Sequence, residues 1–597
     1  MFADIAGFTA WSSVRDPGQV FTLLEQAYGS FDAIAKQRGV FKVETIGDCY
    51  VAVAGLPVPN PQHAVTMVRF ASDCRDAFQR VARDLEVTLG VGTADLQFRF
   101  GLNSGPCTAG VLRGEKSRFQ LFGDTVNTAA RMESSGKPNK IHVSQATADL
   151  LKEAGKGHWL TACTNVIEAK GKGRLQTYFV DVNAPLVSST ETKPADVVEE
   201  PVASVGDTAS RFVDWNIEVL STALRQIGAR RVSPNKKATF TPNLVAKKVK
   251  SEVTEVKEII ALPAFDSNTS LRASSASDVK LSPTVLNELG LLVRAIARMY
   301  PDNPFHNLEH ASHVTMSVVK LLKRIVTPEE ALAKTKNPSK IAAAVHDCTY
   351  GIVSDPLAQF ACIFAAFVHD ADHPGVPNSQ LVKEKSEMAL VYSNKSVAEK
   401  NSLELAWDLL SEPECATLLA FICPNESELY RFRQLLVNLV IGTDIMDKDL
   451  KKISDARWKT AFAESNVAIE QQMNCKATIV MLHLIQASDV SHTMQHWHIF
   501  RKWNENLFEE MYLAYCNGRS DTNPADNWYQ SEIGFFDFYI LPLARKLRDC
   551  GVFGVSSDEY LTYAQKNREE WKERGVDIVA DMVENAQVKY GSKNCVE

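Results

Sequence analysis

Hydrophobic and polar positions divide the 597-residue chain into long parts with different periods. In residues 1–183, short apolar runs alternate with amphipathic stretches. The runs at 41–43 and 50–53 flank a Gly-Asp turn and predict a β-hairpin, while 98–102 alternates as a strand does. Residues 125–132 follow a helical period instead. Strands and helices in this mixed order predict an α/β or α+β domain.

The middle of the chain, residues 184–260, has no continuous apolar period and is punctuated by prolines, which predicts a linker. It contains one stripe of apolar residues that step by four and three positions: Val213, Ile217, Leu220, Leu224 and Ile227. This stripe predicts an amphipathic helix near 209–229 that packs onto a neighbouring domain. From 261 to 597 strand patterns nearly vanish, so we expect an all-helical domain with its core at about 281–590.

The composition is that of a globular protein, with 45% hydrophobic residues and a formal net charge of −7. This charge disfavours nucleic acid as a partner. None of the 12 cysteines forms a Cys-x-x-Cys pair, so neither a disulfide framework nor a zinc ribbon is indicated. No apolar run reaches the ~18 residues of a membrane span, and the first residues do not have the pattern of a signal peptide. We therefore expect the chain to be cytoplasmic.

Three segments of the first part carry polar residues that are candidates for catalysis or metal binding. Asp4 lies at a strand end, Asp48 lies at the tip of the predicted hairpin, and Asn127 and Arg131 share one face of a helix. Each has an ordinary explanation alone, because an Asp at a hairpin tip is usually a turn former and a helical Arg usually meets solvent. In this order and spacing the segments resemble the class III nucleotide cyclase catalytic domain, over nearly all of residues 1–183.

The resemblance implies a ferredoxin-like α+β fold and a homodimer with its active sites at the dimer interface. It also implies that Asp4 and Asp48, with the Ile5 carbonyl, bind two Mg²⁺ or Mn²⁺ ions. Hard cations held by carboxylates lower the pKa of the attacking hydroxyl and offset the phosphate charge.

The remaining cyclase residues implied by the resemblance handle the substrate. Asn127 and Arg131, from the partner chain, would orient the ribose and meet the charge on the α-phosphate, and Lys170 would contact the β- and γ-phosphates. Glu44 falls where guanylate cyclases carry Glu and adenylate cyclases carry Lys, so it favours GTP. Gln120 falls on the second purine position and leaves the choice of base open, because an amide can donate or accept.

In this family the first strand begins several residues before Phe2, so the resemblance predicts that the strand is truncated here. A missing central strand would expose a sheet edge and displace Asp4. We therefore expect a fragment, or an internally started gene model, of a longer protein. Cyclases of this type often follow a receptor and a membrane span, so membrane contact is expected only through an upstream region, at the cytosolic face.

Histidines are concentrated in the second part, where six of the 13 lie between 306 and 373. His306 and His310 are four residues apart, and His369-Asp370 is followed much later by Asp489. A histidine pair at this spacing is more often on the surface than a ligand, and His346-Asp347 is a second His-Asp pair that we interpret as a decoy. The combination nevertheless resembles the class I cyclic-nucleotide phosphodiesterase catalytic domain.

That resemblance implies an all-helical fold with Zn²⁺ beside Mg²⁺ or Mn²⁺. His310, His369, Asp370 and Asp489 would bind zinc, with Asp370 also reaching the second metal. His306 would be the general acid that protonates the leaving O3′. Three further residues fall on positions that hold metal-bound water: His373, Glu399 and Thr443.

The purine pocket departs from the family pattern. The purine-binding glutamine falls on Glu532, while Phe535 and Leu507 either stack on the purine or belong to an ordinary core. An asparagine that contacts the ligand is replaced by His492, and the histidine three residues before Asp489 is replaced by Gln486. None of these departures falls on a direct metal ligand, so they bear on base specificity and not on metal binding.

Together the two resemblances predict one bifunctional enzyme that cyclises a purine nucleoside triphosphate and hydrolyses the 3′,5′-cyclic nucleotide to the 5′-monophosphate. Glu44 and Glu532 are both carboxylates on purine-reading positions, and an ionised carboxylate accepts from guanine but cannot donate to adenine N1. GTP and cGMP are therefore favoured over ATP and cAMP. Two alternatives stay open: an adenylate cyclase with a cAMP phosphodiesterase, and a signalling module in which one domain is an inactive sensor.

Overall fold

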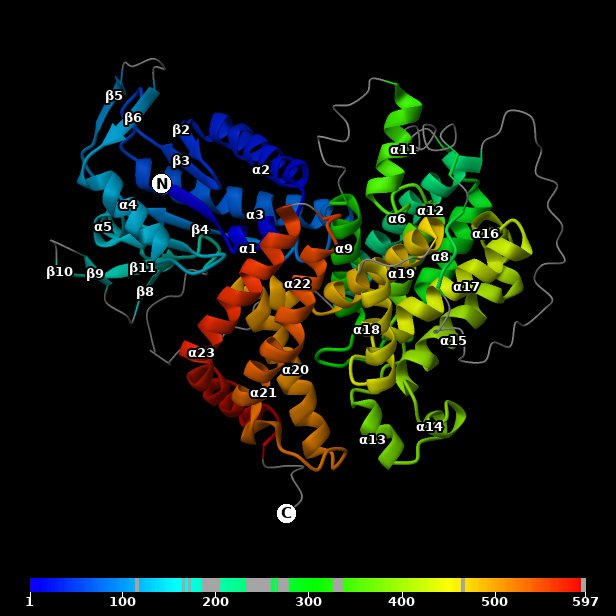
Figure 1. The fold of residues 1–597 in the computed structure, drawn as a ribbon. Helices are drawn as coiled ribbons and strands as arrows, with labels where there is room; N and C mark the ends of the chain where they lie inside the picture. Colours follow the sequence, from blue (N-terminus) through cyan, green and yellow to red (C-terminus); the bar gives the residue numbers. More distant parts are fainter. Residues whose placement is uncertain are drawn as a thin grey trace. The chain divides into compact units, whose positions relative to one another are not determined.

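The computed structural model of the chain separates into two compact units, Met1–Ala203 and Ser204–Glu597 (Figure 1). The structure describes residues 1–112, 118–163, 167–169, 173–184, 205–231, 259–263, 265–266, 279–325, 337–462, 468–553 and 555–591. Among these residues, no helix combines the length and the apolar character that crossing a bilayer requires.

The first unit mixes strands and helices, as its sequence pattern predicts. Its strands are β1 (Phe2–Ala6), β2 (Phe41–Ile46), β3 (Cys49–Val53), β4 (Gln97–Leu102), β5 (Thr108–Leu112), β6 (Arg118–Phe122), β7 (Ile141–Ser144), β8 (Leu160–Ala162), β9 (Ile167–Ala169), β10 (Gly173–Leu175) and β11 (Thr177–Val180). Its helices are α1 (Phe8–Ser13), α2 (Pro17–Arg38), α3 (His63–Leu89), α4 (Asp124–Ser134), α5 (Gln145–Glu153) and a 3₁₀ turn, Gly157–Trp159. One seven-stranded sheet has the order β2-β3-β1-β4-β7-β11-β8, and β5–β6 and β9–β10 form separate pairs.

Strand β1 lies inside the sheet, between β3 and β4. It is antiparallel to both, so that Asp4 lies opposite Cys49 on one side and Arg99 on the other. We expected a short first strand to expose an edge of the sheet and to displace Asp4, and this expectation is wrong. The physical reason is that residues 2–6 are enough to pair with Gln97–Gly101 of β4, and on the other side the Met1 amino group donates to the Ala52 carbonyl of β3 at 2.9 Å.

Helix α4 lies directly against β4 because of Gly101. A Cβ at this position would lie 2.0 Å from the backbone nitrogen of Glu133 and 2.5 Å from the Ala129 carbonyl oxygen. Only a residue without a side chain permits this approach. The contact sets the position of α4, which carries Asn127 and Arg131, relative to the strand next to β1.

The second unit is all-helical in the residues that the structure describes. Its helices are α6 (Val205–Arg231), α8 (Pro283–Ala297), α9 (Leu308–Lys323), α11 (Pro338–Cys348), α12 (Pro356–Val368), α13 (Asn378–Lys383), α14 (Glu387–Val391), α15 (Val397–Ser411), α16 (Ala416–Ile422), α17 (Glu426–Ile441), α18 (Lys448–Phe462), α19 (Ile469–Asp489), α20 (Trp497–Cys516), α21 (Trp528–Phe535), α22 (Leu541–Asp549) and α23 (Val555–Tyr590). Short 3₁₀ turns lie at Pro413–Cys415, Ser491–Met494 and Pro524–Asp526, and Phe536–Ile540 is a π-helical turn.

Helix α12 forms the centre of this unit, with α6, α9 and α17 packed around it. It is apolar on nearly all sides, and a helix of this kind must be buried. Asp355 caps its first turn by accepting from the Ala358 amide, and Pro356 occupies the first helical position, where its missing N–H costs nothing. The helix ends at Val368, so its buried position fixes the position of His369 in the site described below.

The amphipathic helix expected in the linker is α6, which is slightly longer than the predicted range. Leu220, Leu224 and Ile227 are buried in the same core as α12, and Val213 and Ile217 pack against that core. The apolar stripe therefore belongs to the helical unit.

We expect the Gly101→Ala substitution to destabilise the first unit, because the new methyl group must push α4 away from β4. Overpacking of this kind costs about 1–3 kcal/mol of unfolding free energy. Denaturant or thermal unfolding of the chain measures the loss. Gly110→Ala is the matched control, since a Cβ on Gly110 meets no atom within 4 Å. Equal stability of the two variants would contradict the proposed contact.

Candidate active sites

In the first unit, one predicted carboxylate lies on a strand and the other lies in a turn beside that strand. Asp4 is in the middle of β1, and Asp48 is in the β2–β3 turn, next to the Cys49 that pairs with Asp4. Burial raises the pKa of Asp48, and the charge of Asp4 raises it further. Two carboxylates this close to one another suit a divalent cation. Ile5, whose carbonyl is the third predicted ligand, follows Asp4 in β1 and is buried.

Arg99 compensates this negative charge, and the sequence analysis missed it. Its Nη2 donates to Asp4 Oδ2 at 2.9 Å, and its Nε donates to Glu133 Oε1 at 2.9 Å. Burial raises the pKa of Glu133, and the charge of Arg99 opposes that rise. The alternation of 98–102 was a signal for β4, but only the register of β4 against β1 places Arg99 beside Asp4.

Asn127 and Arg131 lie on α4, as the helical spacing predicts. Asn127 is exposed and Arg131 is half-buried. Glu44 on β2 and Gln120 on β6 are half-buried, and their strands are held together by an edge-to-face contact of the Phe41 and Phe119 rings, with centroids 5.2 Å apart. Lys170 lies outside the described residues, so its predicted role has no structural counterpart here.

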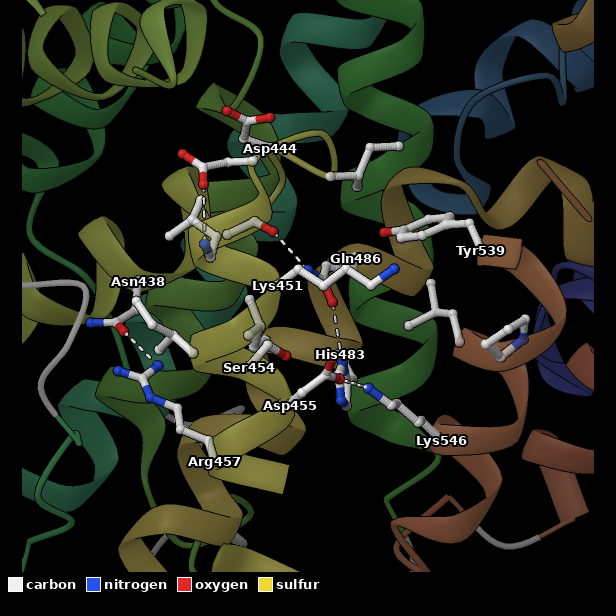
Figure 2. A pocket seen from close by; sticks show the side chains of 18 of the residues that line it. Asn438, Asp444, Lys451, Ser454, Asp455, Arg457, His483, Gln486, Tyr539 and Lys546 are labelled. Carbon is white, nitrogen blue, oxygen red and sulfur yellow. Dashed lines mark hydrogen bonds and ion pairs between the residues drawn. The ribbon is translucent and has the colours of Figure 1, made fainter. Parts of the chain in front are cut away.

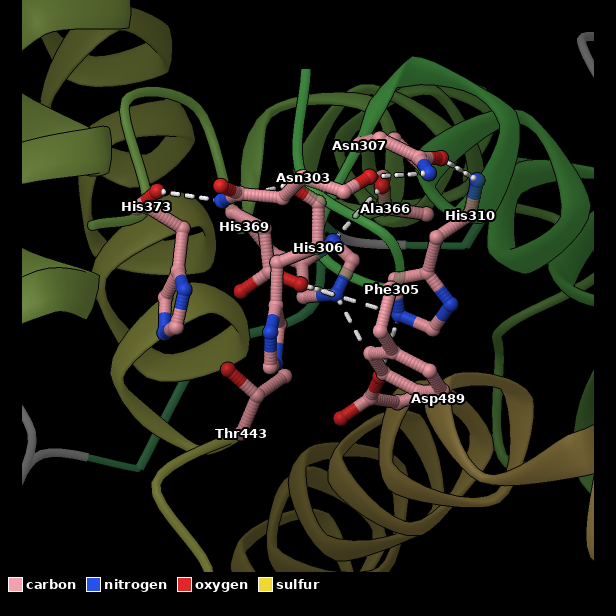
Figure 3. A network of polar contacts seen from close by, with 12 residues as sticks. Asn303, Phe305, His306, Asn307, His310, Ala366, His369, His373, Thr443 and Asp489 are labelled. Carbon is pink, nitrogen blue, oxygen red and sulfur yellow. Dashed lines mark hydrogen bonds and ion pairs between the residues drawn. The ribbon is translucent and has the colours of Figure 1, made fainter. Parts of the chain in front are cut away.

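In the second unit, four predicted ligands from three helices converge (Figure 3). His310 lies in the first turn of α9, His369 and Asp370 follow α12, and Asp489 ends α19. His310 Nε2 and His369 Nε2 lie 3.2 and 3.3 Å from Asp489 Oδ1, and His369 Nε2 lies 3.0 Å from Asp370 Oδ2. One ligand atom from each residue lies within 4.8 Å of all the others.

The donor set fits a divalent metal ion. Two imidazole nitrogens and two carboxylates are typical zinc ligands. The Nδ1 atom of His369 donates to the Ala366 carbonyl at 2.9 Å, which turns Nε2 towards the cluster, as expected for a metal-binding histidine. A second group of close side chains, His306, Asp370 and His373, shares Asp370 with the first.

His306 is held by Glu510, a residue that the sequence analysis missed. Glu510 Oε1 lies 2.5 Å from His306 Nδ1, and Oε2 accepts from the backbone amides of Phe305 and His306, both at 2.9 Å. Burial alone would lower the pKa of His306, but the charge and hydrogen bond of Glu510 raise it to about 9. His306 is therefore protonated at neutral pH. The signal in the sequence that could have indicated Glu510 is an acidic residue on the apolar face of a helix, α20.

The residues predicted to hold water surround this cluster. His373 stacks on His306 with ring centroids 3.8 Å apart, and burial together with the His306 charge lowers its pKa to about 3. Glu399 accepts from Asn378 Nδ2 at 2.9 Å, and burial raises its pKa to about 7. Thr443 is buried and donates to the Val440 carbonyl at 2.8 Å. The neutral His373 and the protonated His306 thus differ in charge although they are in contact.

Glu532 is buried, with 7% of its surface exposed, and is oriented by Asn504. Trp528 Nε1 donates to Asn504 Oδ1 at 3.1 Å, which leaves the Asn504 amide N–H₂ to face the Glu532 carboxyl. Burial raises the pKa of Glu532 to about 7 in spite of this hydrogen bond. Phe535 and Leu507 are only half-buried, which distinguishes them from residues of the deep core.

Comparison with known protein families assigns both units. Residues 1–182 match the family described as adenylate and guanylate cyclase catalytic domain, and residues 305–551 match 3′5′-cyclic nucleotide phosphodiesterase. The chain therefore contains a class III nucleotide cyclase domain followed by a class I phosphodiesterase catalytic domain. The predicted fold classes, a mixed α and β domain and then an all-helical one, are confirmed.

Individual relatives match the first domain. The human guanylate cyclase soluble subunit beta-2 is 38% identical over 208 residues, which is 35% of this chain and 32% of the relative. Human atrial natriuretic peptide receptor 2 is 45% identical over 183 residues, which is 30% of this chain and 16% of the receptor. The crystal structure of the guanylate cyclase domain of RhGC from Catenaria anguillulae in complex with GTP is 41% identical, with 30% of this chain and 93% of that domain covered and a TM-score of 0.26. The chain thus spans a third or less of the two curated relatives.

We expect Glu510→Gln to lower the pKa of His306 from about 9 towards its ordinary value near 6.5, because the negative charge that favours the imidazolium is lost. The protonated form would then disappear above neutral pH. Hydrolysis of a 3′,5′-cyclic nucleotide at pH 8 should fall about ten-fold or more, and the alkaline limb of the pH profile should move to lower pH.

Glu509→Gln is the matched control, because Glu509 lies on the same helix and pairs instead with Lys589 and Tyr590. An alkaline limb that stays in place in Glu510→Gln, or that moves equally in the control, would contradict the role of Glu510.

Proposed function

We propose that the chain both makes and hydrolyses a cyclic purine nucleotide. The first domain would convert GTP to cGMP, and the second would hydrolyse cGMP to 5′-GMP. The observation that carries this proposal is that each domain brings carboxylates, and in the second domain imidazoles, from distant segments into one cluster that suits divalent cations.

In the cyclase reaction, the ribose O3′ forms a bond to the α-phosphorus and loses its proton, while the bond to the bridging oxygen breaks and releases pyrophosphate. Asp4 and Asp48, with the Ile5 carbonyl, would hold two Mg²⁺ or Mn²⁺ ions. These cations supply positive charge at the attacking and leaving oxygens. Arg99 orients the Asp4 carboxylate through its 2.9 Å contact.

Substrate contacts in the cyclase would be completed by a second copy of the chain. Asn127 and Arg131 lie on one face of α4, and the side chain of Asn127 is exposed, as residues that act on a partner's substrate must be. From the partner chain of a homodimer they would orient the ribose and stabilise charge on the α-phosphate. Lys170 would contact the β- and γ-phosphates.

In the hydrolytic reaction, water adds to the cyclic phosphorus and the bond to O3′ breaks. His310, His369, Asp370 and Asp489 would hold Zn²⁺, and Asp370 would also reach Mg²⁺ or Mn²⁺. Cations at these positions act as Lewis acids and lower the pKa of water. His306, kept protonated by Glu510, is placed to give a proton to the leaving O3′.

Residues around the cluster would position the water. Glu399 and Thr443 are both buried or nearly so and present oxygen atoms, and Glu399 is held in place by Asn378. His373 is neutral beside the charged His306, and its Nδ1 accepts from the Gly375 amide at 3.3 Å, so its Nε2 carries the hydrogen and would donate it to the water.

Guanine is the base that the carboxylates favour. Glu44 and Glu532 can accept from the N1–H and 2-amino groups of guanine, and relatives of the first domain include a human guanylate cyclase subunit and a cyclase domain crystallised with GTP. In the second domain, Asn504 donates to Glu532 and thereby favours its ionised form, whereas burial favours the protonated form. A protonated Glu532 could donate to adenine, so both bases are open to this pocket at acidic pH.

The two activities can be tested separately with one pair of variants. We expect the chain, incubated with GTP and Mg²⁺ or Mn²⁺, to form pyrophosphate, cGMP and then 5′-GMP. Asp48→Ala should lower cyclisation about 100-fold or more and leave hydrolysis of added cGMP intact. His369→Ala should remove zinc and hydrolysis, and cGMP should then accumulate. Chromatography of the nucleotides and elemental analysis of zinc measure the outcome.

Each variant is the control for the other, because each changes only one metal cluster. Loss of both activities in either variant would contradict two independent sites. Formation of cyclic nucleotide without any hydrolysis, together with absence of zinc, would show that the second domain is an inactive sensor.

The base preference of hydrolysis should depend on pH. Glu532 has a pKa of about 7, so it is mainly protonated at pH 6 and mainly ionised at pH 8. We therefore expect the ratio of kcat/KM for cGMP to that for cAMP to rise about ten-fold between these values. The titration of His306 cancels in this ratio, because both substrates use the same general acid. In Glu532→Gln the ratio should be lower at pH 8 and independent of pH, and a wild-type enzyme that prefers cAMP throughout would refute the proposal.

A further inference from the structure

A cavity of about 280 Å³ lies between α18, α19 and α22 in the helical unit (Figure 2). Its apolar walls include Leu450, Leu482 and Leu543. The volume is close to the lower end of the ~300–1,000 Å³ of typical small-molecule sites. None of the four proposed zinc ligands lines it, although Gly442 and Asp444, on either side of Thr443, do. It is therefore distinct from the metal cluster but adjoins the segment that carries Thr443.

His483 presents an unsatisfied hydrogen-bond acceptor in this cavity. Gln486 Nε2 donates to the Gly442 carbonyl at 2.8 Å, so Gln486 Oε1 faces His483 Nδ1, 3.1 Å away. Nδ1 must therefore carry the hydrogen, and Nε2 is left as an acceptor. His483 is 2% exposed, and its Nε2 has no hydrogen-bond partner among the residues that the structure describes. Buried polar atoms without partners are rare, and each calls for an explanation.

Tyr539 supplies a second polar atom of the same kind. Its hydroxyl is buried, points into the cavity in Figure 2, and has no hydrogen-bond partner in the described part of the chain. Tyr539 belongs to the π-helical turn Phe536–Ile540 between α21 and α22. Such turns are rare and are frequently found at functional sites. The cavity thus contains both an acceptor that needs a donor and a hydroxyl that can donate.

The charged residues around the cavity balance one another and are in part paired. Lys546 Nζ contacts Asp455 Oδ1 at 2.9 Å, and Asp444 accepts from Ser396 at 2.8 Å. The lining contains three carboxylates and three cationic side chains: Asp444, Asp447, Asp455, Lys451, Arg457 and Lys546. Their formal charges cancel, so the field in the cavity selects neither a strong anion nor a strong cation.

We propose that this cavity is a binding site for an uncharged, planar heteroaromatic molecule. An N–H group of the ligand would donate to His483 Nε2, a ligand acceptor would receive the hydrogen of the Tyr539 hydroxyl, and the ring would pack between the leucine side chains. Burial lowers the pKa of His483 to about 4, which keeps its Nε2 available as an acceptor at neutral pH. The site does not depend on the chemistry proposed for either catalytic cluster.

The test uses two probes that differ only in the required donor. Benzimidazole carries a ring N–H and a ring acceptor, whereas 1-methylbenzimidazole has the same ring without the N–H. Binding to the full chain is followed by ligand-detected NMR titration in the presence of Zn²⁺ and Mg²⁺. We expect 1-methylbenzimidazole to bind at least ten-fold more weakly than benzimidazole. Equal binding of the two probes, or no binding of benzimidazole up to its solubility, would overturn the proposal.

Variants show where benzimidazole binds and distinguish binding in this cavity from binding in the purine pocket. His483→Phe should abolish the difference between the two probes, and Tyr539→Phe, which removes only a hydroxyl, should weaken benzimidazole several-fold without affecting the fold. His496→Phe is the control, because His496 stacks on His498 away from the cavity. If Phe535→Ala abolished binding and Tyr539→Phe left binding unchanged, benzimidazole would lie in the purine pocket instead. This result would also overturn the proposal.

Discussion

Asp489, the last residue of α19, contacts His310 on α9 and His369 at the end of α12 through a single carboxylate oxygen, at 3.2 and 3.3 Å. Burial opposes ionisation of this carboxyl, but the two imidazoles hold its pKa well below its usual range. A buried carboxylate without positive charge nearby would be strongly destabilising. A divalent cation held by the two Nε2 atoms would supply this positive charge. The three helices therefore meet around a site at which this negative charge has positive partners.

The same constraint shapes the first domain. Burial and the charge of Asp4 raise the pKa values of Asp48 and Glu133, and Arg99 lies between Asp4 and Glu133 on the neighbouring strand. Gly101, two residues along the same strand, lets α4 approach closely enough for Glu133 to reach Arg99. One short stretch of β4 therefore supplies both the compensating charge and the space that the cluster needs.

Neighbouring residues also decide what each glutamate of the second domain can do. Glu510 has a pKa lowered to about 2, because the charge and hydrogen bonds of His306 outweigh its burial. Glu532 has a pKa raised to about 7, because burial is opposed only by the neutral Asn504 amide. The first is a permanent anion that holds the general acid, and the second is a group that can change charge near neutral pH. The two side chains are chemically identical, so the difference lies entirely in their surroundings.

The sequence by itself determined the features that depend on local pattern. Hydrophobic periods are a property of neighbouring residues, and they predicted the hairpin around Gly47, the helix that carries Asn127, the stripe of α6 and the change from a mixed to a helical domain. The family resemblance of the histidine motifs likewise predicted a metal site at His310, His369 and Asp370, and these side chains lie close together. Tertiary structure alone decided which residues balance the charges of the residues in these sites. Arg99 meets Asp4 across 95 positions, and Glu510 meets His306 across 204. Such pairs depend on strand register and helix packing, which no local period records, and for the same reason the sequence wrongly suggested that a short first strand would leave the sheet open.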